Sequence, residues 1–316
     1  MKKPTVSVVI PTHNRCNYLK EAVDSIFAQT YKNWELIIID DCSEDETWSW
    51  LCELRDDRVK KIRLEEHAER SAARNVGLRT ARGEFVFFLD DDDLLPVQAL
   101  KQHTEALEKY PRAVGSIGGY IEFDGKGRKG ANRIVRRRTL RNILDDILFG
   151  WPATSGQCLF RIDVIKSVKG WDETFAIAED QHLLLRVARI GPAVLLPDLV
   201  LKFRVHGEQW RPFQTWKIAT KIRQRAVKKL PLNERQRAGR ILQARVDFKQ
   251  ALSHNSQAEP VKALHFFFKS LSADEQVLYR RLARVCATAT SFEDKSSRFF
   301  RAKTRRFRWA GSQSPA

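Results

Sequence analysis

The chain has 316 residues, of which 43% are hydrophobic, and it carries a formal net charge of +17. This length can form one large hydrophobic core with an additional region. No stretch approaches the ~18 uninterrupted apolar residues of a transmembrane helix, and the N-terminus lacks the apolar core of a signal peptide. The five cysteines form no CxxC pair, which excludes a zinc ribbon, argues against a disulfide framework and predicts reduced thiols in a cytoplasmic protein.

The positive charge is concentrated in the C-terminal third of the chain. Residues 1–207 contain 32 Lys and Arg and 31 Asp and Glu, a balance of +1, whereas residues 208–316 contain 24 and 8, a balance of +16. The sequence therefore predicts a nearly neutral body over residues 1–207, followed by a strongly basic region over residues 208–316.

Predicted strands and helices alternate through the first part of the body. The expected strands are Val6–Ile10, Glu35–Ile39 and Val59–Leu64, and the expected helices are residues 18–27 and 71–78. Pro11 is expected to stop the first strand. This alternation is typical of βαβ units, so we expect an α/β fold with a parallel sheet.

The most informative stretch is an apolar run followed at once by four carboxylates, Phe85–Leu89 and then Asp90–Asp93. The run has the length of a strand buried on both faces, so the carboxylates are expected at its C-terminal end, where ligands bind in open α/β sheets. Adjacent carboxylates repel unless a cation relieves the repulsion, and oxygen ligands suit Mg²⁺ or Mn²⁺, which also hold substrate phosphates. The stretch predicts a metal–diphosphate site; an acidic turn that caps the next helix is the alternative.

A glycine-rich phosphate loop is missing from the expected place. The first strand is followed by Pro11-Thr12-His13-Asn14-Arg15, which contains no glycine, and the chain has no Walker lysine motif. Phosphate binding must therefore rest on the acidic edge of the sheet and a metal ion.

Four motifs in this order resemble the family-2 glycosyltransferases of GT-A fold. They are SVVIPTHNR within Val6–Arg15, ELIIIDDCSEDET at Glu35–Thr47, AARNVG at Ala72–Gly77 and GEFVFFLDDDD at Gly83–Asp93. The resemblance covers about residues 5–207. It implies a GT-A, Rossmann-like mixed sheet flanked by helices, and transfer of a sugar from a nucleotide donor with inversion at the anomeric carbon.

The resemblance also implies roles for single residues. Pro11 and Thr12 would lie against the nucleotide, Asp40 would accept a hydrogen bond from the base, typically uracil, and Arg74 would lie near the base or the diphosphate. These residues would form the nucleotide-sugar site together with the acidic turn.

Within that turn, Asp90-Asp91-Asp92 would be the DxD element of the family. Asp92 would bind the Mn²⁺ or Mg²⁺ ion directly, and Asp90 would face the donor sugar or ribose and share the metal. Asp91 and Asp93 could lie behind the ligands, or Asp93 could cap the helix that follows Pro96.

The second part of the body is expected to continue the fold. The expected elements are a helix over Leu94–Lys109, a strand over Val114–Phe123, a short strand over Gln157–Arg161, and two strands over Ala193–Leu196 and Leu199–Val205. Gly118-Gly119 suggests a bulge or a close backbone approach. The basic stretch Lys126–Arg138 is a solvated loop or a cover over the diphosphate or an anionic acceptor. Trp151 could stack on an acceptor sugar or belong to the core.

The segment from Gly170 to Asp180 resembles the "GxDE…ED" segment of the family, in which the second acid of the final pair is the catalytic base. This assigns Asp180, because a sugar hydroxyl must lose a proton as it attacks the anomeric carbon. The alternative is that Glu179 and Asp180 simply complement a helix N-terminus. Family members often carry a histidine after the last strand, so His206 could complete the metal shell or touch the diphosphate.

The basic region is expected to be mainly helical, with helices over residues 216–229, 234–252 and 273–289 and an end that interleaves aromatic and basic residues over 298–309. Such a segment can lie on an anionic membrane surface, remain a solvated tail, or bind nucleic acid or a protein. The membrane surface is favoured over nucleic acid because it suits a polyprenyl-diphosphate-linked or polysaccharide glycan acceptor. We therefore expect a cytoplasmic protein on the inner face of the cytoplasmic membrane, acting in polysaccharide or lipopolysaccharide assembly.

Two other functions were weighed against glycosyl transfer. A sugar-nucleotidyltransferase would be expected to have a glycine-rich basic loop after the first strand. A non-catalytic membrane- or nucleic-acid-binding protein on a decayed transferase fold would not be expected to keep carboxylates at positions 40, 90, 92 and 180.

Overall fold

The computed structural model describes residues 5–124, 127–132, 134–149, 153–206, 212–228 and 230–256. The chain divides into two compact units, residues 1–235 and residues 236–316. The first unit contains the sheet and the candidate site. Of the second unit, the structure describes the continuation of one helix, α9 (Leu232–Ser256). The predicted domain boundary after residue 207 stays a prediction.

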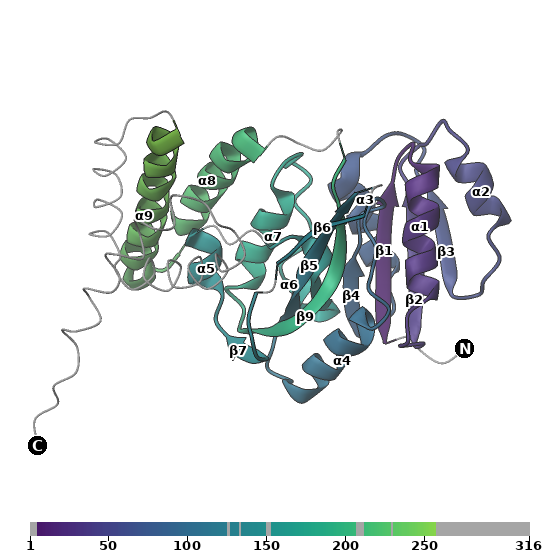
Figure 1. Ribbon diagram of the computed structural model, residues 1–316, viewed down its shortest axis with the longest axis horizontal. Coiled ribbons are helices and arrows are strands. Elements are labelled where there is room, and N and C mark those ends of the chain that lie inside the picture. Colours follow the sequence, from purple (N-terminus) through teal and green to yellow (C-terminus); the bar gives the residue numbers. More distant parts are fainter. Residues whose placement is uncertain are drawn as a thin grey trace, which may run out of the picture. The chain divides into compact units, whose positions relative to one another are not determined.

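The first half of the sheet is parallel and has the strand order β3-β2-β1-β4 (Figure 1). Its strands are β1 (Val6–Thr12), β2 (Trp34–Asp40), β3 (Val59–Arg63) and β4 (Phe85–Phe88). Every residue of β1, β2 and β4 is buried. This confirms the prediction that the apolar runs are strands covered on both faces.

Helices cover both faces of this parallel half. The helices are α1 (Cys16–Phe27), α2 (Thr47–Glu53), α3 (Glu69–Thr80) and α4 (Ala99–Lys109). Alternate residues of β1, such as Val8, belong to the core cluster formed with α1 and α4. On the opposite face α3 packs so closely that a methyl group on Gly77 would lie 2.3 Å from a Val9 side-chain carbon.

Pro11 does not stop β1, contrary to the prediction. The carbonyl of Thr12 accepts from Asp41 of the β2 side, and the carbonyl of Val9 accepts from Leu89 of the β4 side. The backbone nitrogen of Pro11 therefore faces the β4 side, as the backbone of Val9 does. Pro11 lies beyond the last pair of the two strands, Val9 with Phe88. A proline fits there because no ladder hydrogen bond requires its missing N–H.

The second half of the sheet is mixed, in the order β4-β8-β5-β9-β7, with β6 paired to β5. Its strands are β5 (Gly115–Asp124), β6 (Gly127–Asn132), β7 (Thr139–Arg141), β8 (Cys158–Arg161) and β9 (Ala193–Arg204). The predicted α/β fold, a GT-A-like mixed sheet flanked by helices, is thus confirmed. The basic stretch predicted as a loop instead contains β6, which pairs antiparallel with β5.

The last predicted strands are one strand, β9, rather than two. Pairing of β9 with β5 shifts register on both sides of Gly119, so a bulge accommodates the interruption. A methyl group on Gly118 would lie 2.5 Å from a Val200 side-chain carbon. Both parts of the Gly118-Gly119 prediction are confirmed, since there is a bulge and a close approach.

The remaining helices are α5 (Leu144–Phe149), α6 (Ile162–Ser167), α7 (Glu179–Val187) and α8 (Pro212–Lys228), with a short 3₁₀ turn at Ser155–Gln157. The helix predicted from Leu94 begins only at Ala99, because the backbone of Leu94 pairs with Lys202 of β9. None of the helices in the described ranges is long and apolar enough to cross a bilayer. The cysteines described, Cys16, Cys42, Cys52 and Cys158, are free thiols.

Candidate active site

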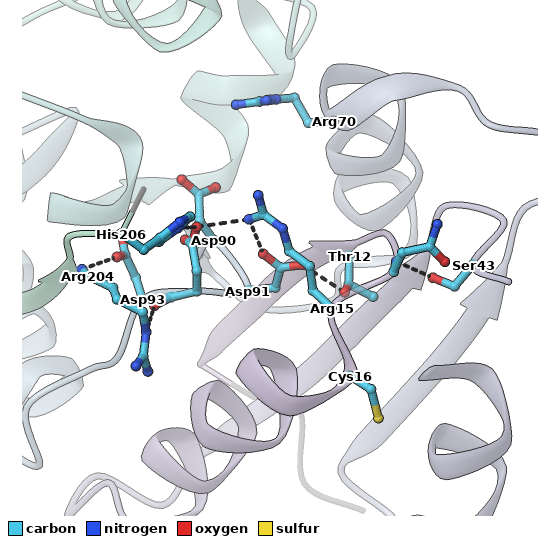
Figure 2. A network of polar contacts seen from close by, with 12 residues as sticks. Thr12, Arg15, Cys16, Ser43, Arg70, Asp90, Asp91, Asp93, Arg204 and His206 are labelled. Carbon is cyan, nitrogen blue, oxygen red and sulfur yellow. Dashed lines mark hydrogen bonds and ion pairs between the residues drawn. The ribbon is translucent and has the colours of Figure 1, made fainter. Parts of the chain in front are cut away.

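The four carboxylates after β4 lie at the C-terminal edge of the sheet, where the strand order reverses between β1 and β4 (Figure 2). Connections leave this point in opposite directions, which is where open α/β sheets form their ligand crevice. The buried Phe85–Phe88 strand fixes the start of the turn. The predicted location of the acidic turn is therefore correct.

Asp91 and Asp92 share one guanidinium. The Nη1 atom of Arg15 lies 3.2 Å from Oδ1 of Asp91 and 2.9 Å from Oδ2 of Asp92. The hydroxyl of Thr12 donates to Asp91 at 2.8 Å, and Nε2 of His206 lies 3.0 Å from Oδ2 of Asp92. The ends of β1 and β9 thus meet the acidic turn at one place.

Asp93 performs a structural task at the same edge. Its Oδ1 accepts a hydrogen bond from the backbone N–H of Arg204 at 2.9 Å, and Nε of Arg204 donates to the carbonyl of Asp92. The Arg204 guanidinium lies against the Tyr18 ring, which stacks on His206. Asp93 therefore fastens β9 to the turn and does not cap the helix after Pro96.

A buried arginine joins the acidic turn to α7. The Nη2 atom of Arg74, on α3, lies 2.5 Å from Asp90, and its Nη1 atom lies 3.1 Å from Glu179. Arg74 is buried and packs over the Trp171 ring. Burial acts to raise the pKa of Asp90, but the charges of Arg74, Arg70 and Arg15 together outweigh it and hold that pKa below its ordinary value.

Helix α3, which carries Arg74, also fixes the loop before α7. The Asn75 carboxamide donates to the Trp171 carbonyl and to the Glu173 carboxylate, and it accepts from the Trp171 N–H. The AARNVG and GxDE motifs are therefore one connected unit. Arg74, predicted near the base or the diphosphate, has carboxylates as its partners in the structure.

Asp180 follows Glu179 in the first turn of α7, after Ala178 turns the chain in the left-handed region at φ 57°. Its Oδ1 accepts the N–H of Gln181 at 2.7 Å. Burial raises the pKa of Asp180 to about 7, and the neighbouring Glu179 charge adds to the rise. A carboxylate with such a pKa is suited to accept a proton near neutral pH.

Asp40 ends β2 as a buried carboxylate. Its Oδ1 accepts the N–H of Ser43, while Oδ2 is buried without a hydrogen bond and lies 3.5 Å from Nε of Arg63. Asp41 instead accepts the N–H of Ala68 at the start of α3. Oδ2 of Asp40 thus has an ion-pair partner but, in the described part of the chain, no hydrogen-bond donor.

Two residues near these acids were not assigned from the sequence. Arg15 follows the strand whose end faces the acidic turn, so its charge and position were the available signal. His67 lies 2.9 Å from Asp41 and contacts the His13 ring, but no motif marks it. Trp151 lies outside the described residues.

The residues fit a divalent cation with two protein ligands. Oδ2 of Asp92 and Nε2 of His206 lie 3.0 Å apart, which matches the ~3 Å edge of an octahedron with ~2.1 Å bonds. Within the described residues no group of three or more His, Cys, Asp or Glu side chains could hold a metal. Mg²⁺ and Mn²⁺ sites commonly use one or two side chains, and substrate phosphates and water complete the shell.

The sequence profile of the family described as "Glycosyl transferase family 2" matches residues 7–167, about half of the chain. The chain belongs to this family. The matched range includes Asp40, Arg74 and the acidic turn, so the site lies largely inside the shared region. The chain is therefore a glycosyltransferase, and neither the sugar-nucleotidyltransferase nor the non-catalytic alternative is supported.

Relatives of this glycosyltransferase include proteins from several bacteria. A glycosyltransferase of uncharacterized function from Haemophilus influenzae is 29% identical over 217 residues, which span 65% of this chain and 67% of that protein. The putative teichuronic acid biosynthesis glycosyltransferase TuaG of Bacillus subtilis is 39% identical over 105 residues, 33% of this chain and 42% of TuaG. The match thus spans between about two fifths and two thirds of these relatives.

Solved structures share the fold at low sequence identity. Residues 1–349 of TarS from S. aureus align with a TM-score of 0.64 and 20% identity, over 86% of this chain and 82% of that one. The mannosyltransferase PcManGT from Pyrobaculum calidifontis aligns with a TM-score of 0.54 and 19% identity, over 96% and 80%. TarS was solved with UDP-GlcNAc, and PcManGT with GDP-Man and Mn²⁺.

Proposed function

We propose that this glycosyltransferase moves a sugar from a nucleotide donor, a UDP-sugar, to an acceptor hydroxyl with inversion and with the help of Mn²⁺ or Mg²⁺. The observation that carries the proposal is the Arg74 bridge, because it links Asp90 of the acidic turn to Glu179, the neighbour of Asp180. The donor-side acids and a carboxylate suited to be a general base are thereby held at one site.

The nucleotide part of the donor is proposed from Asp40. A buried carboxylate oxygen without a hydrogen bond is costly, so a ligand N–H at Oδ2 would be favourable, and uracil offers one. Pro11 and Thr12 end the neighbouring strand at the same edge. The UDP-GlcNAc and UDP complexes of TarS agree with this choice, and the GDP-Man complex of PcManGT makes GDP the alternative.

The proposed chemistry is a direct displacement. Asp180 accepts the proton of the acceptor hydroxyl, whose oxygen forms a bond to the anomeric carbon as the bond to the diphosphate oxygen breaks. The leaving diphosphate keeps the electron pair, and no covalent nucleophile is needed. When bound by Asp92 and His206, with Asp90 close by, a divalent cation supplies positive charge to the leaving group.

The acceptor is proposed to be a growing cell-envelope glycan, lipid-linked or polysaccharide. The name of the relative TuaG, a putative teichuronic acid biosynthesis glycosyltransferase, supports an acceptor of this kind. Residues 208–316 contain 24 Lys and Arg against 8 Asp and Glu, and basic clusters gain about 1 kcal/mol per residue at an anionic membrane surface. We place the protein on the inner face of the cytoplasmic membrane. Recovery of the intact chain away from anionic liposomes in a flotation assay at physiological salt would refute this placement.

The donor proposal is tested by calorimetric titration with UDP, with and without Mn²⁺. Wild-type protein is expected to bind UDP in a metal-dependent way, and Asp92→Ala is expected to abolish that dependence. Asp24→Ala, a change of an exposed carboxylate on α1, is the matched control and should bind as wild type does. Binding of GDP in place of UDP would change the donor, whereas no nucleotide binding would overturn the proposal.

A further inference from the structure

A positively charged side chain, that of Arg15, already lies in the acidic turn. Arg15 bridges Asp91 and Asp92 through one nitrogen, Nη1, at 3.2 and 2.9 Å. The Asp91 and Asp92 side chains are only 8% and 13% exposed. Like charges that are this buried repel strongly, so the guanidinium is a principal source of their neutralisation.

The backbone of Arg15 is fixed, while its side chain is partly exposed. The preceding residue, Asn14, donates its N–H to Ser43 and accepts the N–H groups of Glu44 and Asp45. The following residue donates its N–H to the Asp45 carboxylate. The Arg15 side chain is 34% exposed. Rotation about its side-chain bonds can therefore release the carboxylates without moving α1.

Arg15 uses the same oxygen that the metal would need. Oδ2 of Asp92 is the partner of Arg15 and also of His206, at 2.9 and 3.0 Å. Figure 2 shows the Arg15 side chain reaching the acidic turn, with dashed contacts to its carboxylates. A guanidinium and a dication at one oxygen would repel each other over a distance of a few ångströms.

We propose that Arg15 is an internal counter-ion that holds the cation place of the acidic turn until the donor arrives, and that its release couples metal binding to nucleotide binding. This inference rests on the proposed metal-dependent function. Once displaced from Asp92, the guanidinium can contact the negatively charged diphosphate at the same sheet edge. Because coupling is reciprocal, the nucleotide strengthens metal binding as much as the metal strengthens nucleotide binding.

The test measures free Mn²⁺ by electron paramagnetic resonance during titration of the full chain, with and without UDP. Without UDP, Arg15→Gln is expected to bind Mn²⁺ about tenfold more tightly than wild type, because no guanidinium competes for Asp92. Saturating UDP should strengthen Mn²⁺ binding by a smaller factor in Arg15→Gln than in wild type. Arg189→Gln removes the same charge from an exposed side chain just beyond the end of α7, at the opposite end of that helix from Asp180, so it should stay close to wild type.

A second measurement keeps the inference testable if the variant is weakly folded. In EDTA the melting temperature of Arg15→Gln should be below that of wild type, and Mn²⁺ should restore more of it than in wild type. Arg15→Lys should fall between the two proteins in both measurements.

Two results would overturn the inference, and they differ from each other. If wild type binds Mn²⁺ with UDP but Arg15→Gln binds Mn²⁺ no more tightly than wild type, the counter-ion role is wrong and the proposed function stands. If neither protein binds Mn²⁺ even with UDP, the metal requirement of the proposed function is wrong, and the inference is refuted with it.

Discussion

The two ends of the candidate site hold their carboxylates in opposite ways. In the acidic turn after β4, Asp90, Asp91 and Asp92 are each paired with an arginine. At the start of α7, Asp180 has a hydrogen bond from Gln181 and, among the residues described, no ion pair. Arginine partners hold the pKa of Asp90 below its ordinary value, whereas burial raises the pKa of Asp91 to about 6 in spite of Arg15 and raises that of Asp180 to about 7.

The difference teaches that environment can assign two roles to one type of side chain. A carboxylate whose cation partners outweigh its burial, as at Asp90, stays ionised and suits the binding of charge, but a desolvated carboxylate near another acid suits proton transfer. Arg74 lies at both ends, since it pairs with Asp90 and Glu179. The variants below are meant to remove or sharpen this contrast.

The largest effect is expected from Asp180→Asn. Loss of the general base should lower kcat by about 10²–10⁴-fold, while UDP should still bind because the Asp180 side chain is hydrogen-bonded to Gln181 and not to a residue of the acidic turn. Initial rates and calorimetry measure the two quantities. Asp57→Asn, a change of an exposed carboxylate, is the matched control. If turnover survives in Asp180→Asn, Asp180 is not the general base.

The next effect concerns the bridge between the two ends. Arg74→Gln should lower the free energy of unfolding by about 3 kcal/mol, because Glu179 would remain buried with only the exposed Arg70, 3.9 Å away, as a partner, whereas the more exposed Asp90 could be hydrated. Urea denaturation measures the change. Lys101→Gln removes an exposed pair on α4 and should cost no more than about 0.5 kcal/mol. Equal effects of the two variants would contradict the structural role of the bridge.

Asp180 should also affect stability in a pH-dependent way. A carboxyl whose pKa is raised on folding destabilises the protein once it is charged, so the cost is absent below about pH 4, grows as the pH rises, and is complete above about pH 7. At pH 8, Asp180→Asn should therefore be more stable than wild type by about 4 kcal/mol, since each of about three pKa units is worth about 1.4 kcal/mol, and the gain should shrink towards pH 4. Thermal melts of both proteins across this range measure it. A gain that does not depend on pH would show that titration of Asp180 is not its cause.

The smallest effect is a shift of the pH profile. We expect kcat to fall below about pH 7 as Asp180 takes up its proton. Since the Glu179 charge helps to raise that pKa, Glu179→Gln should move the acidic limb to lower pH. Glu105→Gln, an exposed change on α4, should leave the limb in place. If the acidic limb does not move in Glu179→Gln, the Glu179 charge does not contribute to the pKa of Asp180.

Local signals in the sequence were enough to predict the sheet edge that carries the acidic turn. A buried run such as Phe85–Phe88 can be recognised because both faces of a parallel strand are covered, and the acids that follow must then emerge at the ligand edge. The strands that carry Asp40 and Thr12 follow the same rule. The order of motifs also indicated the family, and the family profile confirms it.

Contacts between distant segments account for what the sequence did not predict. Arg15 finds Asp91 and Asp92 across 76 and 77 positions, and Arg74 finds Glu179 across 105. The continuity of β9 depends on its pairing with β5, and β6 depends on a hairpin partner, so neither follows from its own composition. Leu94 likewise pairs through its backbone with Lys202, and this tertiary contact overrides the local preference for a helix.

One contact of α8 bears on the order in which the protein can mature during synthesis. Arg223 is buried; its Nη2 atom donates to the side chain of Gln181, 2.5 Å away, and its Nε atom donates to the carbonyl of Ile147. Gln181 directly follows Asp180, and Arg223 comes 42 residues later. At about 5–20 residues per second, the ribosome needs about 2–8 s to add that stretch. During synthesis α7 therefore cannot pack fully until a later part of the chain is made, and a polypeptide released early, at residue 207, would lack the Arg223 contact.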